Sequence, residues 1–225
     1  MKVTNEIFQV GGDRFSSPED AAVYLLCFAG HAALIDAGCG YAQKRILSNI
    51  ERCGVPLSAV EAILLTHCHF DHAGGAQSMK KALGCSLVAH ELDSPYLENG
   101  DDEVTAAAWY GSAMMPVTPD RKLQGPRQTL SLGPRTLEAI HIPGHSPGST
   151  AYLAESEGLR VLFGQDVHGP IHPSLRSNLR DYWNSLELLL TLEADVLCEG
   201  HYGVYRGKKA VADFIAGFLT GGRSR

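Results

Sequence analysis

The chain has 225 residues, of which 44% are hydrophobic and 20% charged, proportions typical of a globular protein. Its formal net charge is −6, and its Lys and Arg residues form no run longer than a pair such as Lys80-Lys81. These features argue against nucleic acid as a partner. No stretch approaches ~18 continuous apolar residues, which argues against a membrane span.

Residues 1–8 show no basic stretch followed by an apolar core, so they do not predict a secretory signal. The six cysteines are scattered and include no CxxC pair, which indicates reduced thiols rather than a disulfide framework. We therefore expect a cytoplasmic protein that acts on a small molecule, either as a monomer or as a homo-oligomer.

Apolar runs and helical spacing predict alternating strands and helices in the first half of the chain. In order, these are strands at residues 7–10, 24–29 and 32–35, a helix at 42–52, a strand at 62–66, a helix at about 73–83 and a strand at 86–89. The second and third strands are expected to form a hairpin that turns at Gly30-His31. The first helix is expected to stop at Gly54, before Pro56.

Residues 91–128 interrupt this rhythm, with several prolines around a predicted helix at 103–114. Strands then resume at 128–132, 137–142, 150–154 and 161–164, followed by a helix at 176–192, a strand at 196–198 and a helix at 207–219. Two runs of strands interleaved with helices predict an α/β protein in which two sheets pack together. We expect one domain over residues 1–225, because an insertion of ~38 residues at about 91–128 is too short for a core of its own.

Four side chains that can bind metals occupy six positions directly after the apolar strand at 62–66. They belong to the segment Thr66–Gly75, which contains the pattern HxHxDH as His67, His69, Asp71 and His72. In an extended chain, the first three share one face, while Cys68 and Phe70 point the other way, and His72 turns in as a helix begins. Buried imidazoles and carboxylates need strong partners, which metal ions supply. The pattern therefore predicts a metal site, with Cys68 as a packing residue.

This segment resembles the signature of the metallo-β-lactamase superfamily, and later motifs of that family follow in order. They are Pro143–Ser149 around His145, Leu162–Asp166, and Glu199-Gly200-His201, while Leu34–Gly38 resembles an earlier motif. The resemblance covers essentially the whole chain. It implies an αββα four-layer sandwich of two mixed β-sheets flanked by helices, with metals in a groove at the edge of the two sheets.

The resemblance also implies a role for each motif residue. His67, His69 and His145 would hold one divalent metal ion, Asp71, His72 and His201 would hold a second, and Asp166 would bridge both. A ligand set of nitrogen and oxygen suits zinc first, with iron or manganese as alternatives. Asp36 would support the metal loop from behind, or would simply be a turn residue before Gly38.

Two metal ions flanking one water lower its pKa from 15.7 towards ~7 and so provide a hydroxide at neutral pH. The resemblance thus implies a hydrolase that uses a hydroxide bridging two metal ions to cleave an ester, thioester or lactone bond of a small molecule. Asp71 is also a candidate catalytic residue, because it would accept or relay the proton of the hydroxide. Ser146 is expected to shape the turn at His145 rather than to act as a nucleophile.

Other residues have two interpretations each. His168 would protonate a leaving group or bind substrate, or be a surface-loop histidine, and His172 and Tyr202 are similar cases. Trp109 and Tyr110, with Met114 and Met115, would form an apolar substrate wall or the packed face of a helix. Packing is the only role expected for His31, His90 and His141.

The family contains several reactions, so its fold does not determine the substrate. Its β-lactamases lack an Asp at the position of Asp166 and are generally exported. Its glyoxalase II and lactonase members share the seven ligands, but they differ after the bridging Asp, where this chain has His168-Gly169-Pro170. An iron-dependent persulfide dioxygenase is the main alternative, and a β-lactamase or a non-catalytic metal-binding regulator are further ones.

Overall fold

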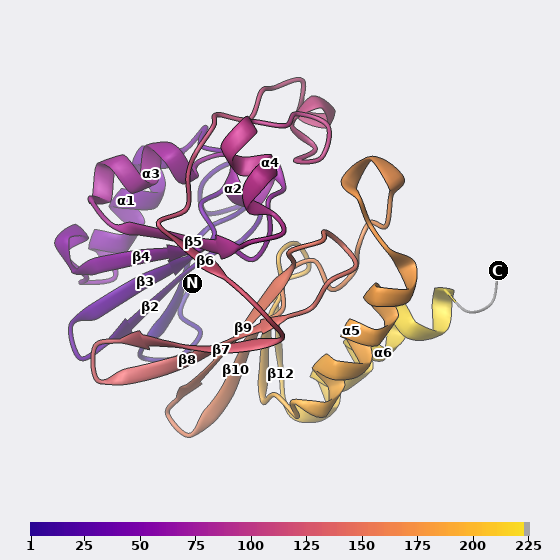
Figure 1. The fold of residues 1–225 in the computed structure, drawn as a ribbon. Helices are drawn as coiled ribbons and strands as arrows, with labels where there is room; N and C mark the ends of the chain where they lie inside the picture. The colour runs from indigo at the N-terminus through magenta and orange to yellow at the C-terminus, as the bar shows by residue number, and fades with distance from the viewer. Residues whose placement is uncertain (223–225) are drawn as a thin grey trace.

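The structure is a computed structural model that describes residues 1–222. In these residues, two six-stranded sheets lie face to face, with helices on both outer sides (Figure 1). This four-layer αββα arrangement of two mixed sheets confirms the predicted fold class. Among the described helices, none is long and apolar enough to cross a lipid bilayer.

The first sheet has the strand order β1-β2-β3-β4-β5-β6. Its strands are β1 (Ile7–Gly11), β2 (Val23–Phe28), β3 (His31–Ile35), β4 (Val60–Leu64), β5 (Ser86–His90) and β6 (Arg121–Leu123). β1, β2 and β3 pair antiparallel, whereas β3 to β6 pair parallel. The carboxyl ends of β3, β4 and β5 therefore lie at the same end of the sheet.

The second sheet has the strand order β12-β11-β10-β9-β8-β7. Its strands are β7 (Arg127–Leu132), β8 (Arg135–His141), β9 (Thr150–Ser156), β10 (Leu159–Phe163), β11 (Val196–Cys198) and β12 (Val204–Arg206). Only β10 and β11 pair parallel, and the other neighbours are antiparallel.

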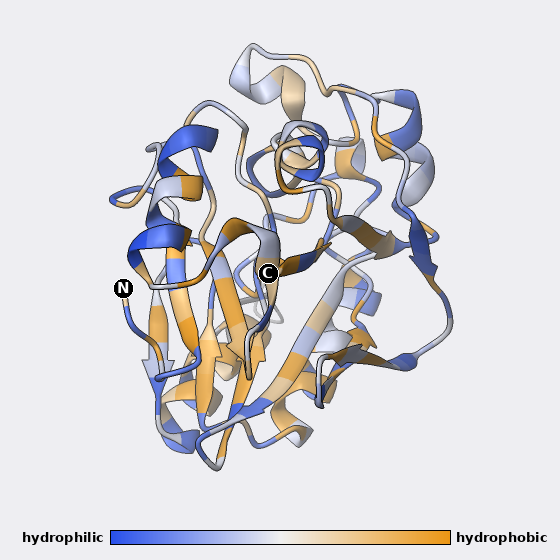
Figure 2. Cartoon of the chain, turned by 90° about the vertical axis from the view of Figure 1, so that its left-hand side faces the viewer, coloured by the Kyte–Doolittle hydropathy of each residue, from blue (hydrophilic) through white to orange (hydrophobic). Residues whose placement is uncertain are grey.

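Alternate residues of one strand supply two different cores, because side chains point to opposite faces of a sheet. In β3, Ala33 and Ile35 join the core between the sheets, which also contains Tyr152 and Phe163 of the second sheet. Leu34 faces the other way, into the core beneath the outer helices. The strands are consequently rich in hydrophobic residues on both faces, as Figure 2 shows.

Four helices form the outer layers (Figure 1). α1 (Gln43–Arg52) and α3 (Ala76–Leu83) cover the first sheet, where Ile46, Ile50 and Met79 are fully buried. α5 (Leu179–Thr191) and α6 (Lys208–Gly222) cover the second sheet. A single 3₁₀ turn, η1 (Leu57–Ala59), leads into β4.

The predicted helix at 103–114 is wrong. The structure has α4 (Ser94–Asn99), which ends at Gly100 in the left-handed conformation, and then a 3₁₀ turn, η2 (Ala107–Tyr110). The Asp101 side chain accepts the backbone N–H groups of the second and third residues after it. Such local hydrogen bonds compete with those of a helix, which explains why apolar spacing alone gave the wrong prediction here.

The predicted helix at 73–83 is divided into α2 (Phe70–Ala73) and α3 by Gly74 and Gly75. Both glycines pack tightly against the loop after β3, since a Cβ built at Gly75 would lie 2.5 Å from the carbonyl oxygen of Ala37. This close approach holds the first turn of the histidine segment against the first sheet.

The predicted helix at 176–192 starts at Leu179, as α5, because Asn178 caps it by accepting the backbone N–H groups of Arg180 and Asp181. A 3₁₀ turn, η3 (Pro173–Leu175), precedes it. The hairpin between β2 and β3 turns at residues 29–30, one position earlier than predicted, and His31 is the first residue of β3.

Candidate metal centre

The seven predicted ligands lie in loops that follow the carboxyl ends of four strands. His67 and His69 follow β4, and the short helix α2 then supplies Asp71 and His72. The other three come from the second sheet: His145 follows β8, Asp166 follows β10 and His201 follows β11. The structure brings all seven together, and we refer to them as the cluster.

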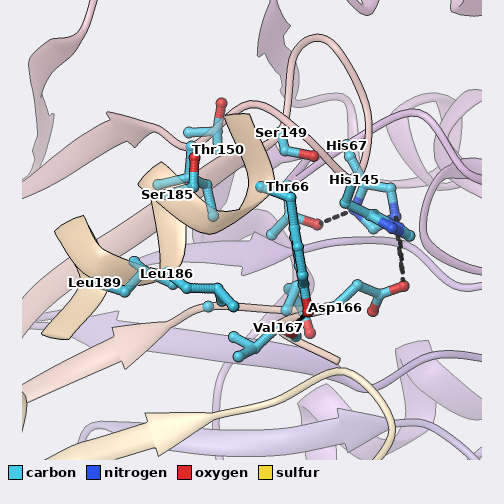
Figure 3. A pocket seen from close by; sticks show the side chains of 14 residues that line it. Thr66, His67, His145, Ser149, Thr150, Asp166, Val167, Ser185, Leu186 and Leu189 are labelled. Carbon is cyan, nitrogen blue, oxygen red and sulfur yellow. Dashed lines mark hydrogen bonds and ion pairs between the residues drawn. The ribbon is translucent and has the colours of Figure 1, made fainter. Parts of the chain in front are cut away.

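Three histidines and a carboxylate form the first half of the cluster. The Nε2 atoms of His67 and His145 are 3.2 Å apart, and Oδ2 of Asp166 lies 3.2 Å from His145 Nε2 and 3.8 Å from His67 Nε2. Figure 3 shows His145 and Asp166 directed at one another. His69 completes this group, whose ligand atoms all lie within 4.8 Å of one another.

Asp71, His72 and His201 form the second half, again with ligand atoms within 4.8 Å of one another. Oδ2 of Asp71 lies 3.1 Å from His201 Nε2 and 3.6 Å from His72 Nε2. The other oxygen of Asp166, Oδ1, lies 3.1 Å from His72 Nε2 and 3.4 Å from His201 Nε2. Asp166 thus presents one oxygen to each half.

Hydrogen bonds behind the cluster orient three of its imidazoles. Asp36 Oδ2 lies 2.7 Å from Nδ1 of His72 and also accepts the Thr66 hydroxyl at 2.8 Å. Because this hydroxyl donates to Asp36, its oxygen is free to accept from Nδ1 of His67 at 3.0 Å. Nδ1 of His145 lies 2.8 Å from the carbonyl oxygen of Pro170. Such contacts fix the tautomer and leave Nε2 as the ligand atom.

An unpaired ligand atom in the cluster indicates whether these residues fit metal ions. Nε2 of His69 is buried and has no hydrogen-bond partner among residues 1–222. A buried polar atom of this kind is costly unless something binds it. Imidazole nitrogens and carboxylate oxygens are the ligands that zinc, iron and manganese accept. The donor set therefore fits a divalent cation in each half.

The pKa values of His67 and His69 in the first half and of His72 and His201 in the second half shift in opposite directions. Burial lowers the pKa of His67 and His69 well below the usual range, and the neighbouring imidazoles lower the pKa of both further. Burial would also lower the pKa of His72, but the surrounding carboxylates raise it well above the usual value. For His201, hydrogen bonds that its ring donates to the Asp166 and Asp71 carboxylates outweigh burial and raise the pKa to about 10. The second half thus favours positive charge.

The geometry corrects one detail of the predicted loop. Asp71 does not share an extended strand with His67 and His69, because helix α2 begins at Phe70 and already contains Asp71. As predicted, Cys68 points away from the cluster and is fully buried in the core beneath α1 and α3. Ser146 shapes the turn after β8 as predicted, through hydrogen bonds to Asp93 and to the Ser149 hydroxyl.

Two buried carboxylates, Glu199 and Asp93, have roles at the cluster that were not predicted. Glu199 is fully buried; its Oε1 lies 2.8 Å from Nδ1 of His168, and its Oε2 accepts the backbone N–H groups of His201 and Tyr202. Asp93 accepts the backbone N–H groups of Cys68 and Gly148, so it joins the loops after β4 and β8. An acidic residue directly after the apolar strand at 196–198 was a usable signal for the first of these.

Aromatic residues from the irregular segment pack against segments that also carry residues of the cluster. The ring of Tyr110 packs against Phe70 with centroids 5.5 Å apart, and Trp109 meets the ring of His172 edge-on at 5.5 Å. Trp109 is 53% exposed, so it is not the buried face of a helix. Met114 is buried and Met115 is exposed, which separates this predicted set into packing and surface residues.

Two cavities adjoin the cluster on different sides. Behind His67 and His145, a cavity of only about 20 Å³ is closed by α5 through residues such as Leu186 (Figure 3). Beside His201, a cavity of about 520 Å³ extends towards Arg14 and Arg206. His201 is also the most exposed side chain of the cluster, at 34%. A substrate therefore has room on the His201 side.

The three remaining histidines lie outside the cluster. His31 contacts Glu61 at the start of β3. His90 of β5 and His141 of β8 stack with ring centroids 4.0 Å apart and an interplanar angle of 12°. These positions agree with the packing roles that were predicted for them.

Comparisons with known proteins agree with this geometry. The family model of the metallo-β-lactamase superfamily matches residues 17–201. An acyl-coenzyme A thioesterase MBLAC2 of Gallus gallus is 29% identical over 234 residues, which cover 90% of this chain and 80% of that protein. A hydroxyacylglutathione hydrolase of Anaeromyxobacter dehalogenans is 35% identical over 155 residues, which cover 69% of this chain and 49% of that protein.

Several other curated relatives are also matched over less than two thirds of their own length. Among solved structures, BJP-1, a subclass B3 metallo-β-lactamase of Bradyrhizobium japonicum, has a TM-score of 0.73 and 29% identity. That match covers 89% of this chain and 76% of the other.

Proposed function

We propose that the chain, which belongs to the metallo-β-lactamase superfamily, is a hydrolase that uses two metal ions to cleave a thioester bond of a small molecule. The observation that carries the two-metal proposal is the position of Asp166. Its oxygens face opposite halves of the cluster, as expected of a carboxylate that bridges two cations.

In this proposal, His67, His69 and His145 would hold the first ion, and Asp71, His72 and His201 would hold the second, with Asp166 shared. When bound, two divalent ions supply a nucleophile at neutral pH by lowering the pKa of a water, and they polarise the scissile carbonyl. Zinc is the preferred assignment, with iron or manganese as alternatives.

The side chains of the protein then handle protons and substrate. Asp71 lies 5% exposed at the floor of the site, where its carboxylate can accept a proton from the attacking water. His168 follows Asp166 by two residues, and its ring packs edge-on against His201 with centroids 5.1 Å apart. From this place, His168 can also reach the leaving group of a substrate beside His201.

Two observations favour a thioester over an ester or a lactone. The relatives from Gallus gallus and Anaeromyxobacter dehalogenans are named for thioester hydrolysis, of acyl-coenzyme A and of hydroxyacylglutathione. The thiol halves of both compounds are long and carry negative charge. The cavity beside His201 is large, at about 520 Å³, which gives room for a long thiol half; Arg14 and Arg206 line it together with Asp13 and Asp20.

The test is a substrate panel with protein loaded with zinc, manganese or iron. Acyl-coenzyme A and acylglutathione thioesters, an aryl ester, a lactone and a β-lactam are compared, with free thiol or product measured directly. We expect metal-dependent thiol release that a chelator abolishes, and close to two metal equivalents per chain. Cleavage of the ester or lactone without the thioesters would contradict the substrate class. A reproducible value near one equivalent would contradict the two-metal mechanism.

A further inference from the structure

His168 lies in a position that the seven-ligand cluster does not use. With Asp166 and His201 it forms a third group whose ligand atoms all lie within 4.8 Å of one another. A turn places it there: the backbone N–H of Gly169 donates to the carbonyl oxygen of Asp166 at 3.1 Å, and Gly169 has a φ of 91°. The loop therefore returns to the cluster directly after the bridging residue.

The Glu199 carboxylate holds the His168 ring in the manner of a metal ligand. Glu199 is fully buried, and its Oε1 lies 2.8 Å from Nδ1 of His168. A buried carboxylate that accepts Nδ1–H leaves Nε2 with a free lone pair. The same arrangement occurs once more in the cluster, between Asp36 and His72 at 2.7 Å. A surface-loop histidine has no need of a buried carboxylate dedicated to its ring.

Glu199 also links His168 to His201. Its second oxygen, Oε2, accepts the backbone N–H groups of His201 at 2.7 Å and of Tyr202 at 2.8 Å. One side chain therefore fixes the ring of His168 and the backbone of His201 together. This coupling is expected if both histidines must keep a set distance to a shared ion.

We propose that His168, with Asp166 and His201, forms a further position for the second metal ion. The proposal rests on the two-metal site described above. His201 Nε2 has one lone pair, so an ion at this position and an ion held by Asp71, His72 and His201 exclude each other. The protein therefore still binds two ions, but the second has two alternative ligand sets.

A comparison of single and double variants tests this proposal through metal binding alone. Zinc stoichiometry and affinity are measured by competition with a chelator for the wild type, Asp71→Ala, His168→Ala and the double variant. Asp71→Ala removes a ligand from the set of Asp71, His72 and His201 but leaves Asp166, His168 and His201 intact. This variant should therefore still bind a second equivalent of zinc. His168→Ala should also bind two. The double variant has lost a ligand from each set, so its second equivalent should bind at least ~10-fold more weakly than in Asp71→Ala.

His172→Ala combined with Asp71→Ala is the matched control, because His172 lies in the same loop but contacts Trp109. Circular dichroism confirms the fold of each variant, and the visible spectrum of Co²⁺-loaded protein reports on ligation in His168→Ala even if Asp71→Ala does not fold. Equal second-equivalent affinities in Asp71→Ala and the double variant, or an unchanged Co²⁺ spectrum in His168→Ala, would overturn the proposal. These readouts need no substrate, so they are independent of whether the enzyme cleaves thioesters.

Discussion

Asp36 Oδ2 lies 2.7 Å from Nδ1 of His72, and Nε2 of the same ring faces Asp166 Oδ1 at 3.1 Å. Asp36 is fully buried, and the same oxygen also accepts the Thr66 hydroxyl and the Gln165 amide. An ionised carboxylate is the only side-chain group with two oxygens that both accept hydrogen bonds and never donate them. Asp36 is thus the structural basis for the orientation of His72.

Asp36→Asn should therefore weaken binding of the second metal ion by about 10–100-fold, the usual effect of removing such a partner. The backbone should tolerate the change, because Asp36 has a φ of 63° and Asn adopts this conformation readily. Zinc competition with a chelator measures the affinity. Asp120→Asn, at a carboxylate that binds Leu87 N and Lys80, is the control and should bind both ions as the wild type does.

Gly200 lies directly against the Asp166 carboxylate. A Cβ built at this position would lie 2.6 Å from Oδ1 of Asp166 and 2.9 Å from Oε1 of Gln165. We expect Gly200→Ala to displace Asp166 and to reduce both metal content and turnover by at least ~10-fold, since small displacements of a catalytic group are costly. Gly217→Ala in α6 is the matched control, because a Cβ there would meet nothing within 4 Å. Wild-type metal content in Gly200→Ala would show that Asp166 need not hold its present position.

Trp109 contacts His172, in the loop that follows Asp166, and is 53% exposed. Trp109→Ala should alter substrate affinity, raising KM several-fold, while metal content stays unchanged. Aromatic side chains contribute a large apolar contact area, so the effect should grow with the apolar part of the substrate. Leu179→Ala removes another exposed apolar side chain and is the control. Wild-type kinetics of Trp109→Ala on every substrate would leave Trp109 with no role in binding.

The seven residues of the cluster could be predicted to lie together, four of them from residue type and spacing and three from the resemblance of their motifs to those of the family. His67, His69, Asp71 and His72 stand together after an apolar strand, and His145, Asp166 and His201 stand in motifs at later strand ends. The sheets bring strand ends together regardless of the distance along the chain. The strands themselves were predictable where continuous apolar residues make them fully buried, as in β3.

The parts that could not be predicted depend on tertiary contacts. Glu199 and Asp93 act through single buried carboxylates, whose partners lie up to 55 positions away in sequence. The charged edge strand β6 has no hydrophobic pattern to reveal it, since two of its three residues are exposed. The helix predicted at 103–114 is absent for a related reason. Hydrogen bonds from the backbone to the Asp101 side chain determine the conformation at the start of that segment.

His90 provides a pH-dependent contribution to stability away from the cluster. Burial, followed by the neighbouring His141, lowers the pKa of His90 from 6.5 to about 4. Below pH 6.5 the unfolded chain takes up a proton that the folded chain does not, so stability is fully present above pH 6.5 and declines until about pH 4. His90→Gln, which carries no charge at any pH, should reduce this decline by roughly 1–3 kcal/mol.

Urea unfolding of the wild type and His90→Gln at pH 7.5 and at pH 4.5 measures the effect. Contributions from titrating groups distant from His90 are common to both proteins and cancel in the comparison. If the wild type and His90→Gln lost the same free energy of unfolding between pH 7.5 and pH 4.5, the stack of His90 and His141 would make no pH-dependent contribution to stability.

Asp166→Asn tests the two-metal mechanism most directly. The variant preserves the volume of the side chain but removes a negative charge that offsets two divalent cations. It also replaces one oxygen with an NH₂ group, which cannot bind a cation, so one half of the cluster must lose its shared ligand. Each half keeps three other ligands, but Oδ1 faces His72 and the more exposed His201, so we expect the second ion to bind more weakly.

Hydrolysis by Asp166→Asn should fall by at least ~10²-fold even at saturating metal, since loss of electrostatic stabilisation at the reacting atoms costs several kcal/mol. Asp195→Asn is the control, at a carboxylate that accepts the backbone N–H of Arg160 far from the cluster. It should keep both ions and normal turnover. If Asp166→Asn retained both ions and near-normal turnover, Asp166 would not be the bridge. Asp71, which lies 3.1 Å from His201, would then have to position the nucleophile.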